Sequence, residues 1–156
     1  MSVRLAAATA RRRLLAGLID AGCCAAISAI PYILGIFTID DLVAPEGIFW
    51  PDHALALLGR SPVRVLAPGL WALAVWCVWQ FAWVTFWRGW TPGGRAASVQ
   101  IVDGAADAPG WSVAALRVVG HAASAASLGL GWLWVLVSPS RRSWADLASG
   151  SAAVRR

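Results

Sequence analysis

Charged side chains lie inside or beside long apolar runs of this sequence. Such groups can form ion pairs within a membrane or bind a proton or an ion there. Asp20 lies in an apolar run that follows three arginines, the last of which is Arg13. A carboxylate in the hydrocarbon core costs about 2.5–3.5 kcal/mol on insertion scales. Seven residues of helix separate the two charges by about 10 Å on one face, which is too far for a direct pair. The candidate partners of suitable charge are Arg117, His121, Arg141 and Arg142.

Two interpretations of Asp20 are open. Its carboxylate fixes the helix register through one buried ion pair or hydrogen bond, or it carries a proton or an ion. Near the C-terminus, Asp146 follows Arg142 by four residues, a spacing that permits a same-face helical pair. We expect an arginine–aspartate network that ties the first helix to the C-terminal segment. A buried pair of this kind specifies an arrangement more than it adds stability.

Three apolar stretches must position these groups, at about 14–37, 66–87 and 113–138. About 20 apolar residues suffice to cross a bilayer as a helix. The composition agrees, since 59% of the 156 residues are hydrophobic and only 13% are charged. We therefore expect an all-α membrane protein that forms a single transmembrane domain over residues 1–156.

The third stretch is interrupted by the sequence "SLGLGW", and the arginines suggest how it runs. If it crosses fully, the two sides of the membrane carry seven and six arginines. If it dips in and returns, one side carries eleven, Arg4 among them, and the other carries two. The positive-inside rule favours the second arrangement. We expect two full spans plus a re-entrant hairpin with both termini inside, and a plain third span is the alternative.

The two connections differ in character. The first, at 38–65, contains Asp40, Asp41 and three prolines, and we expect a loop there with a short helix near 53–59. In the second, the alternating sequence around 97–103 predicts a short interfacial strand that ends in a turn.

Tryptophans recur at spacings of three and four along the second stretch, which places them on one helical face. Interfacial or lipid-facing positions are one explanation. The other is a face that docks a partner or a second copy, because the row continues through the depth of the bilayer. The tryptophan face consists of Trp76, Trp79, Trp83, Trp87 and Trp90, with Gln80 beside it.

Small residues form a stripe in the third stretch and indicate close helix packing. On the same stretch Arg117 and His121 are one turn apart. The arginine either extends to the interface or pairs with an acid, and the histidine is either a packing residue or a ligand. The members of the stripe are Gly120, Ser124, Ser127 and Gly131.

Several function classes find no support in the sequence. The cysteines Cys23, Cys24 and Cys77 lie in apolar runs, without the spacing of a disulfide framework or a metal site. No phosphate-binding loop, zinc pattern or catalytic triad is recognisable. The arginines flank apolar runs instead of forming a stripe that would suit nucleic acid. We expect no enzyme activity, no cofactor, no metal and no nucleic-acid partner.

Two segments at opposite ends of the chain resemble the RDD family of small bacterial membrane proteins, named for an arginine and two aspartates. In "RLLAGLID", Arg13 matches the arginine and Asp20 the first aspartate. In "RRSWADLASGSAAV", Asp146 matches the second aspartate, while Ala145 replaces a frequent His or Gly and Ser151 replaces Thr.

The middle of the chain carries the third match. "GWTPGGRAASVQIVDG" resembles a G-x-T-x-G-K-R segment followed by a valine-rich strand that ends in Asp-Gly. Gly94 stands where the family usually has lysine. The matching positions are Gly89, Thr91, Gly93 and Arg95.

The resemblance implies a multi-pass protein of the bacterial inner membrane, in a family broadly suspected of transport. With the arginine count it gives a cytoplasmic N-terminus. Two functions are considered, a small oligomeric transporter or ion-coupled carrier, and a non-transporting subunit or scaffold that docks a larger membrane complex. The expected partners are the lipid bilayer and a second copy or another membrane protein.

Overall fold

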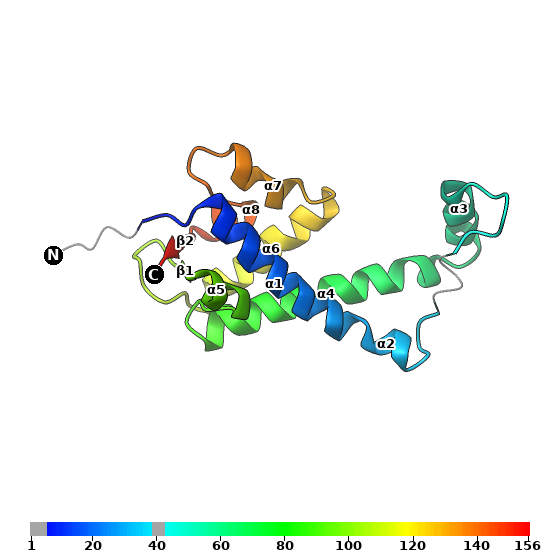
Figure 1. The fold of residues 1–156 in the computed structure, drawn as a ribbon, viewed down its shortest axis with the longest axis horizontal. Coiled ribbons are helices and arrows are strands. Elements are labelled where there is room, and N and C mark those ends of the chain that lie inside the picture. Colours follow the sequence, from blue (N-terminus) through cyan, green and yellow to red (C-terminus); the bar gives the residue numbers. More distant parts are fainter. Residues whose placement is uncertain (1–5, 39–42) are drawn as a thin grey trace. The chain divides into compact units, whose positions relative to one another are not determined.

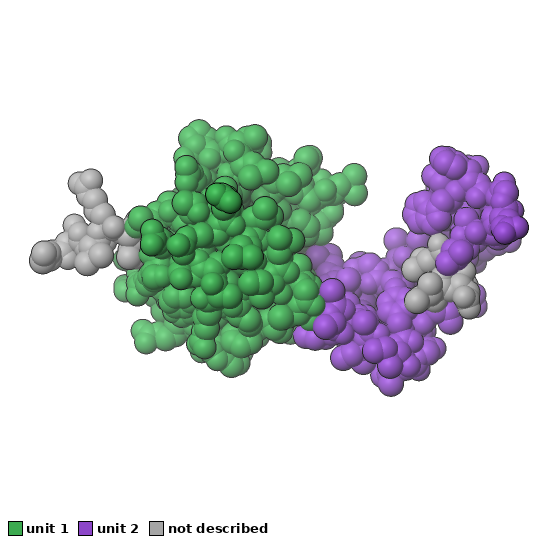
Figure 2. Space-filling view, viewed as in Figure 1, with its two compact units in different colours: residues 1–23, 76–156 green, residues 24–75 purple. Residues whose placement is uncertain are grey.

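The computed structural model describes residues 6–38 and 43–156, most of which are helical (Figure 1). Arg4, Asp40 and Asp41, used above in the sequence argument, lie outside the described residues. The chain forms two compact units, which Figure 2 shows in separate colours. Unit 1 comprises Met1–Cys23 and Trp76–Arg156, and unit 2 comprises Cys24–Val75.

Two helices are long and apolar enough to cross a membrane, which confirms the first two predicted spans. Helix α1 (Ala10–Ser28) continues after a break into α2 (Ile30–Ile33), and the two form one candidate span. Helix α4 (Pro62–Phe86) begins with proline, whose fixed φ suits a first helical position. Its 25 residues extend for about 37 Å, more than the ~30 Å hydrocarbon core.

The third hydrophobic segment is broken where the sequence predicts it. Helix α6 (Trp111–Ala126) and helix α7 (Leu130–Val137) meet at an angle of 98°. Between them Leu128 and Gly129 have positive φ values of 56° and 90°, and residues in this conformation cannot continue a right-handed helix. The bent pair has the geometry of a broken span or a re-entrant loop.

Unit 1 also contains short elements that lie outside the long helices. Helix α5 (Pro92–Ala97) leads into strand β1 (Val99–Val102), which confirms the strand predicted around 97–103. Helix α8 (Trp144–Ser149) leads into strand β2 (Ala152–Arg155). The two strands pair antiparallel with Val99 opposite Arg155, and Ala7 bridges to Val154 on the free edge of β2.

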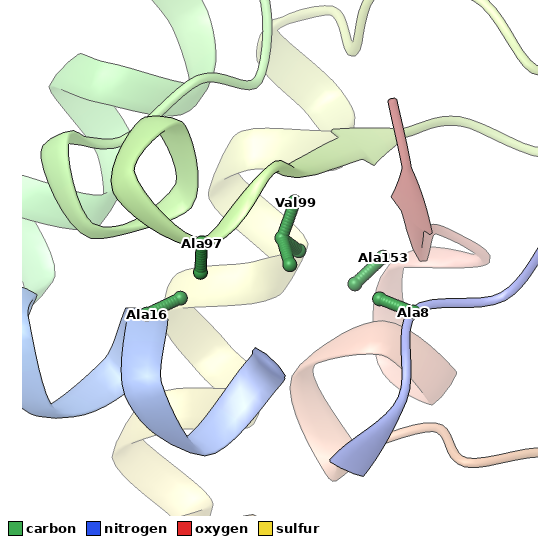
Figure 3. Packing of buried hydrophobic residues seen from close by; sticks show 5 residues of the cluster. All are labelled: Ala8, Ala16, Ala97, Val99 and Ala153. Carbon is green, nitrogen blue, oxygen red and sulfur yellow. The ribbon is translucent and has the colours of Figure 1, made fainter. Parts of the chain in front are cut away.

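A cluster of small buried side chains joins these distant segments (Figure 3). It brings together the start of the chain, α1, the end of α5 and both strands. Four of its five members are alanines, so the backbones can approach one another closely. The members are Ala8, Ala16, Ala97, Val99 and Ala153.

Unit 2 holds the shorter helices α2 and α3. Helix α3 (Trp50–Arg60) confirms the short helix predicted near 53–59 and begins three residues earlier. None of its residues is buried. After α2 the chain turns back so that the ring of Tyr32 meets Phe37 edge to face, with centroids 5.4 Å apart.

Candidate functional site

An ion-pair cluster lies in unit 1 and consists of Arg13, Arg117 and Asp146. Asp146 lies in α8 and is completely buried. Its Oδ1 accepts a hydrogen bond from Nη1 of Arg117 on α6 at 2.5 Å, and its Oδ2 pairs with Nη2 of Arg13 on α1. One carboxylate thus joins three helices that are far apart in sequence.

The start of α8 orients the Asp146 carboxylate. Ser143 caps the helix by accepting a hydrogen bond from the Asp146 N–H, and its own N–H donates to Oδ2 of Asp146 at 3.0 Å. This reciprocal capping box orients the Asp146 side chain independently of the two arginines. On the other side, Nη1 of Arg117 also donates to the hydroxyl of Ser151 at 2.6 Å, and Arg13 donates to the carbonyl of Arg141.

The electrostatics of the cluster favour the ionised carboxylate. Burial raises the pKa of Asp146, but the charges of Arg117 and Arg13 and the hydrogen bonds from both outweigh burial and hold the pKa well below its usual range. Asp146 is therefore a permanent anion at physiological pH. Such a group is suited to fixing an arrangement and not to exchanging protons.

Asp20 has different partners from those expected from the sequence. Its Oδ1 accepts a hydrogen bond from the backbone N–H of Gly93 at 2.9 Å, and the Thr91 side chain bonds the same carboxyl group. The expectation of an arginine beside Asp20 is wrong, because both partners are neutral groups at the start of α5. The Trp79 indole N–H lies near this carboxyl but outside hydrogen-bond geometry with any acceptor in the described residues.

Close backbone contact explains why Gly93 can reach Asp20. A Cβ atom at Gly93 would lie 2.0 Å from the carbonyl oxygen of Ala16, one turn before Asp20 on α1. Thr91 caps α5 by accepting from the Gly94 N–H at 2.9 Å. A side chain at Gly94 would lie 2.6 Å from the carbonyl oxygen of Val99, so the lysine usual in the family does not fit this backbone unchanged.

The small-residue stripe packs α6 against its neighbours. A Cβ at Gly120 would lie 2.4 Å from Cα of Ala145, which lies in α8 next to Asp146. A Cβ at Gly131 would lie 2.1 Å from the hydroxyl of Ser124, which donates to the carbonyl of Gly120. Ser127 closes the turn after α6 by donating to the Ser124 carbonyl at 3.0 Å. These contacts hold α6, α7 and α8 together around the cluster.

One end of the tryptophan face packs against other side chains of unit 1. Trp76 meets His121 edge to face at 5.7 Å, and Trp132 donates its indole N–H to Nδ1 of His121 at 3.0 Å. The buried Nε2 of His121 has no hydrogen-bond partner in the described part of the chain. His121 is thus a packing residue between tryptophans and not a partner of Asp20.

The far part of the tryptophan face is less enclosed. The ring of Trp83 contacts the rings of Trp79 and Trp87 in tilted arrangements, with centroids 5.4 Å and 4.2 Å apart, and Trp87 remains 44% exposed. Trp90 is half-buried after the end of α4, and Gln80 is buried. Ring contacts therefore join Trp79, Trp83 and Trp87, of which Trp87 is exposed and the other two are half-buried.

Two arginines named from the sequence lie elsewhere. Arg142 precedes α8 and does not lie on it, so the same-face helical pair that the spacing would permit with Asp146 is not formed. Arg141 contributes its carbonyl oxygen instead of its charge. Ser143, which caps α8 and orients Asp146, was not identified from the sequence. The signal was available, because "SWAD" has the serine and the acid of a capping box at the right spacing.

No group of three or more His, Cys, Asp or Glu side chains that could hold a metal occurs in residues 6–38 and 43–156. The model of the RDD family matches residues 7–150 of the chain, which include the ion-pair cluster and the Asp20 site. No curated protein and no solved structure matches the chain.

Proposed function

Since the chain belongs to the RDD family of membrane proteins, we propose that it is a small oligomeric carrier driven by a proton or cation gradient, with Asp20 as the carboxylate that binds the ion. It has no catalytic role in this proposal. We place it in the bacterial inner membrane with the N-terminus in the cytoplasm.

The contrast between the two aspartates carries this proposal. Asp146 is neutralised by two arginines, whereas Asp20 is 3% exposed, lies within a candidate span and, in the part of the chain that the structure describes, is bound by two neutral groups, the Thr91 side chain and the Gly93 N–H. Two neutral donors do not cancel a charge in a medium of low dielectric constant. A carboxylate in that position can alternate between a protonated or cation-bound state and an ionised state, which ion-coupled carriers require.

The bent pair α6–α7 supports the same function. Non-helical backbone at membrane depth is tolerated where it is buried in protein or lines a water-filled cavity. Transporters commonly build their sites from such interrupted helices. Two spans and one bent pair provide little material to enclose a pathway, so we propose that several copies assemble around it.

The alternative function, a scaffold that docks a larger membrane complex, would need a tryptophan face that is free to bind a partner. Trp76 contacts His121 and Trp132, and Trp79 lies near Asp20, so these two side chains are used within unit 1. Only the part around Trp83 and Trp87 is left for a partner.

Purified protein in proteoliposomes tests the proposal. We expect an imposed pH, sodium or potassium gradient to dissipate faster than in protein-free liposomes, and the detergent-solubilised mass to correspond to two or more copies. A protein that leaves every gradient unchanged and co-purifies with another membrane protein would instead be a scaffold.

A further inference from the structure

A polar pocket of about 480 Å³ lies beside the C-terminal end of α4, within unit 1. Neither the ion-pair cluster nor the Asp20 site lines it. Its charged lining consists of Arg88, Arg95, Arg156 and Asp107. Among the side chains that line the pocket, three guanidinium groups stand against one carboxylate, an excess of two positive charges that suits an anion.

The side chains that line the pocket indicate which class of anion it binds. Guanidinium groups present planar pairs of N–H donors that match the oxygens of a phosphate. Trp87 and Trp90 also line the pocket, and so does Phe86, the last residue of α4. Phe86 is 67% exposed and Trp87 is 44% exposed, so apolar surface adjoins the arginines at the end of a membrane-crossing helix.

This combination occurs at the level of lipid headgroups. Tryptophan is enriched at the membrane–water interface, and arginine near a span binds acidic lipids. A soluble anion needs the arginines but gains nothing from the exposed aromatic rings next to them. A phospholipid needs both, because its phosphate meets the arginines while its glycerol and acyl chains run along Trp87, Phe86 and α4.

The backbone of the pocket is held in place. The side chain of Gln100, a buried residue of β1, donates its Nε2 hydrogen to the carbonyl of Arg88 at 2.8 Å. Arg88 and Gly89 both have positive φ, and a Cβ at Gly89 would lie 2.0 Å from the carbonyl oxygen of Ile101. The turn that presents Arg88 is therefore anchored to β1. The N–H of Arg156 bonds the carbonyl of Ser98, which anchors the end of the chain at the same place.

We propose that this pocket binds the phosphate of an anionic phospholipid headgroup, such as that of phosphatidylglycerol. The site is independent of any transport through Asp20, because the two share no residue.

Lipid binding by the full chain in detergent, followed by native mass spectrometry, tests the proposal. Short-chain phosphatidylglycerol, phosphatidylcholine and inorganic phosphate are the three probes. We expect the double variant Arg88→Gln with Arg95→Gln to bind phosphatidylglycerol about 30-fold more weakly, since each arginine near a surface contributes roughly 1 kcal/mol. The control, Arg11→Gln with Arg60→Gln, loses the same charge from exposed positions outside the pocket and should bind as the wild type does.

A variant that is expected to bind phosphatidylglycerol more tightly provides a second test, because misfolding would not increase the affinity. Asp107→Asn removes the one acid of the pocket and should tighten phosphatidylglycerol binding about fivefold. Equal binding of phosphatidylglycerol and phosphatidylcholine would overturn the proposal, and so would equal loss in the control. Displacement of the lipid by an equal concentration of inorganic phosphate would also overturn it, since the site would then recognise a soluble anion.

Discussion

Gly93 donates its backbone N–H to the carboxylate of Asp20 at 2.9 Å, although the two residues are 73 positions apart. The bond exists because α5 touches α1 at a glycine, where any side chain would collide with the Ala16 carbonyl. The second aspartate, Asp146, is bound by two arginines instead. One acid thus has neutral partners and the other has charged ones.

Gly93→Ala should separate α5 from α1. The added methyl group would lie 2.0 Å from the Ala16 carbonyl oxygen, so the backbone must shift and the bond to Asp20 is lost. We expect a loss of about 1–3 kcal/mol of stability, as for other overpacked positions. Thermal unfolding in detergent measures it.

Gly17→Ala is the matched control, because a Cβ at Gly17 in α1 meets nothing within 4 Å. This change should leave stability unchanged or raise it by roughly 0.5–1 kcal/mol, the usual effect inside a helix. Equal unfolding temperatures for Gly93→Ala and Gly17→Ala would show that the α5–α1 contact is not tight.

Asp146→Asn should be the most damaging of the conservative substitutions. The amide keeps the shape but leaves Arg13 and Arg117 without a countercharge, at a cost on the order of 3–5 kcal/mol. We expect poor yield and early elution as aggregate in size-exclusion chromatography. Asp52→Asn, on exposed helix α3, is the control and should behave as the wild type does.

The pH dependence of stability follows from the lowered pKa of Asp146. A carboxyl whose pKa is lower in the folded protein than in the unfolded chain adds stability above its unfolded value, about 4, and loses it as the pH falls through the folded value. The melting temperature should therefore change little on account of Asp146 from pH 8 to 5 and fall below pH 4. A fall that begins at pH 6 would point to another group.

The tryptophan face should divide into two parts on mutation. Trp76→Ala removes contacts to His121 and Trp132 inside unit 1 and should cost about 2 kcal/mol, less than the 3–5 of a fully buried aromatic residue. Trp87→Ala removes ring contacts to Trp83 and Phe86 at a more exposed position and should lower the melting temperature less than Trp76→Ala does. If the exposed part of the tryptophan face docks a second copy, Trp87→Ala should also reduce the fraction of oligomer, which the detergent-solubilised mass measures. The reverse order of stabilities would contradict the packing described for Trp76.

Topology can be measured with reporters. The arginine count of eleven against two predicts that a fusion after Arg156 reads as cytoplasmic and that an insertion near Glu46 reads as external. An external reading after Arg156 would mean that α6 and α7 cross the membrane as one broken span.

The sequence predicts the long elements well, because their signals are local. Uninterrupted apolar runs identify the two spans, and the glycines of "SLGLGW" identify the break between α6 and α7. The short helices α5 and α8 were not predicted, since six residues carry little periodicity. Their caps, Thr91 and Ser143, were the available local signals.

The partners of the aspartates could be predicted only in part. Charge balance indicates an arginine–aspartate network that joins α1 to the C-terminal segment, and the structure contains one, although its pairs are Arg13 with Asp146 and Arg117 with Asp146 and do not include Asp20 or the Arg142 side chain. The same logic assigns an arginine to Asp20 and is wrong there, because the Gly93 N–H and the Thr91 side chain bind this carboxylate instead. Which N–H does so depends on the close approach at Gly93, and that approach is a tertiary contact with no signature in the local sequence.

The most direct test of Asp20 as the ion-binding carboxylate is the flux of Asp20→Asn in proteoliposomes, beside wild type and Asp52→Asn. The amide keeps an acceptor for the Gly93 N–H but cannot ionise, so we predict wild-type folding, shown by elution and melting, with gradient dissipation reduced to that of protein-free liposomes. The Asp52→Asn control should retain wild-type flux. Folded Asp20→Asn with wild-type flux would contradict the role of Asp20, and the residue would then serve only to join α1 to α5.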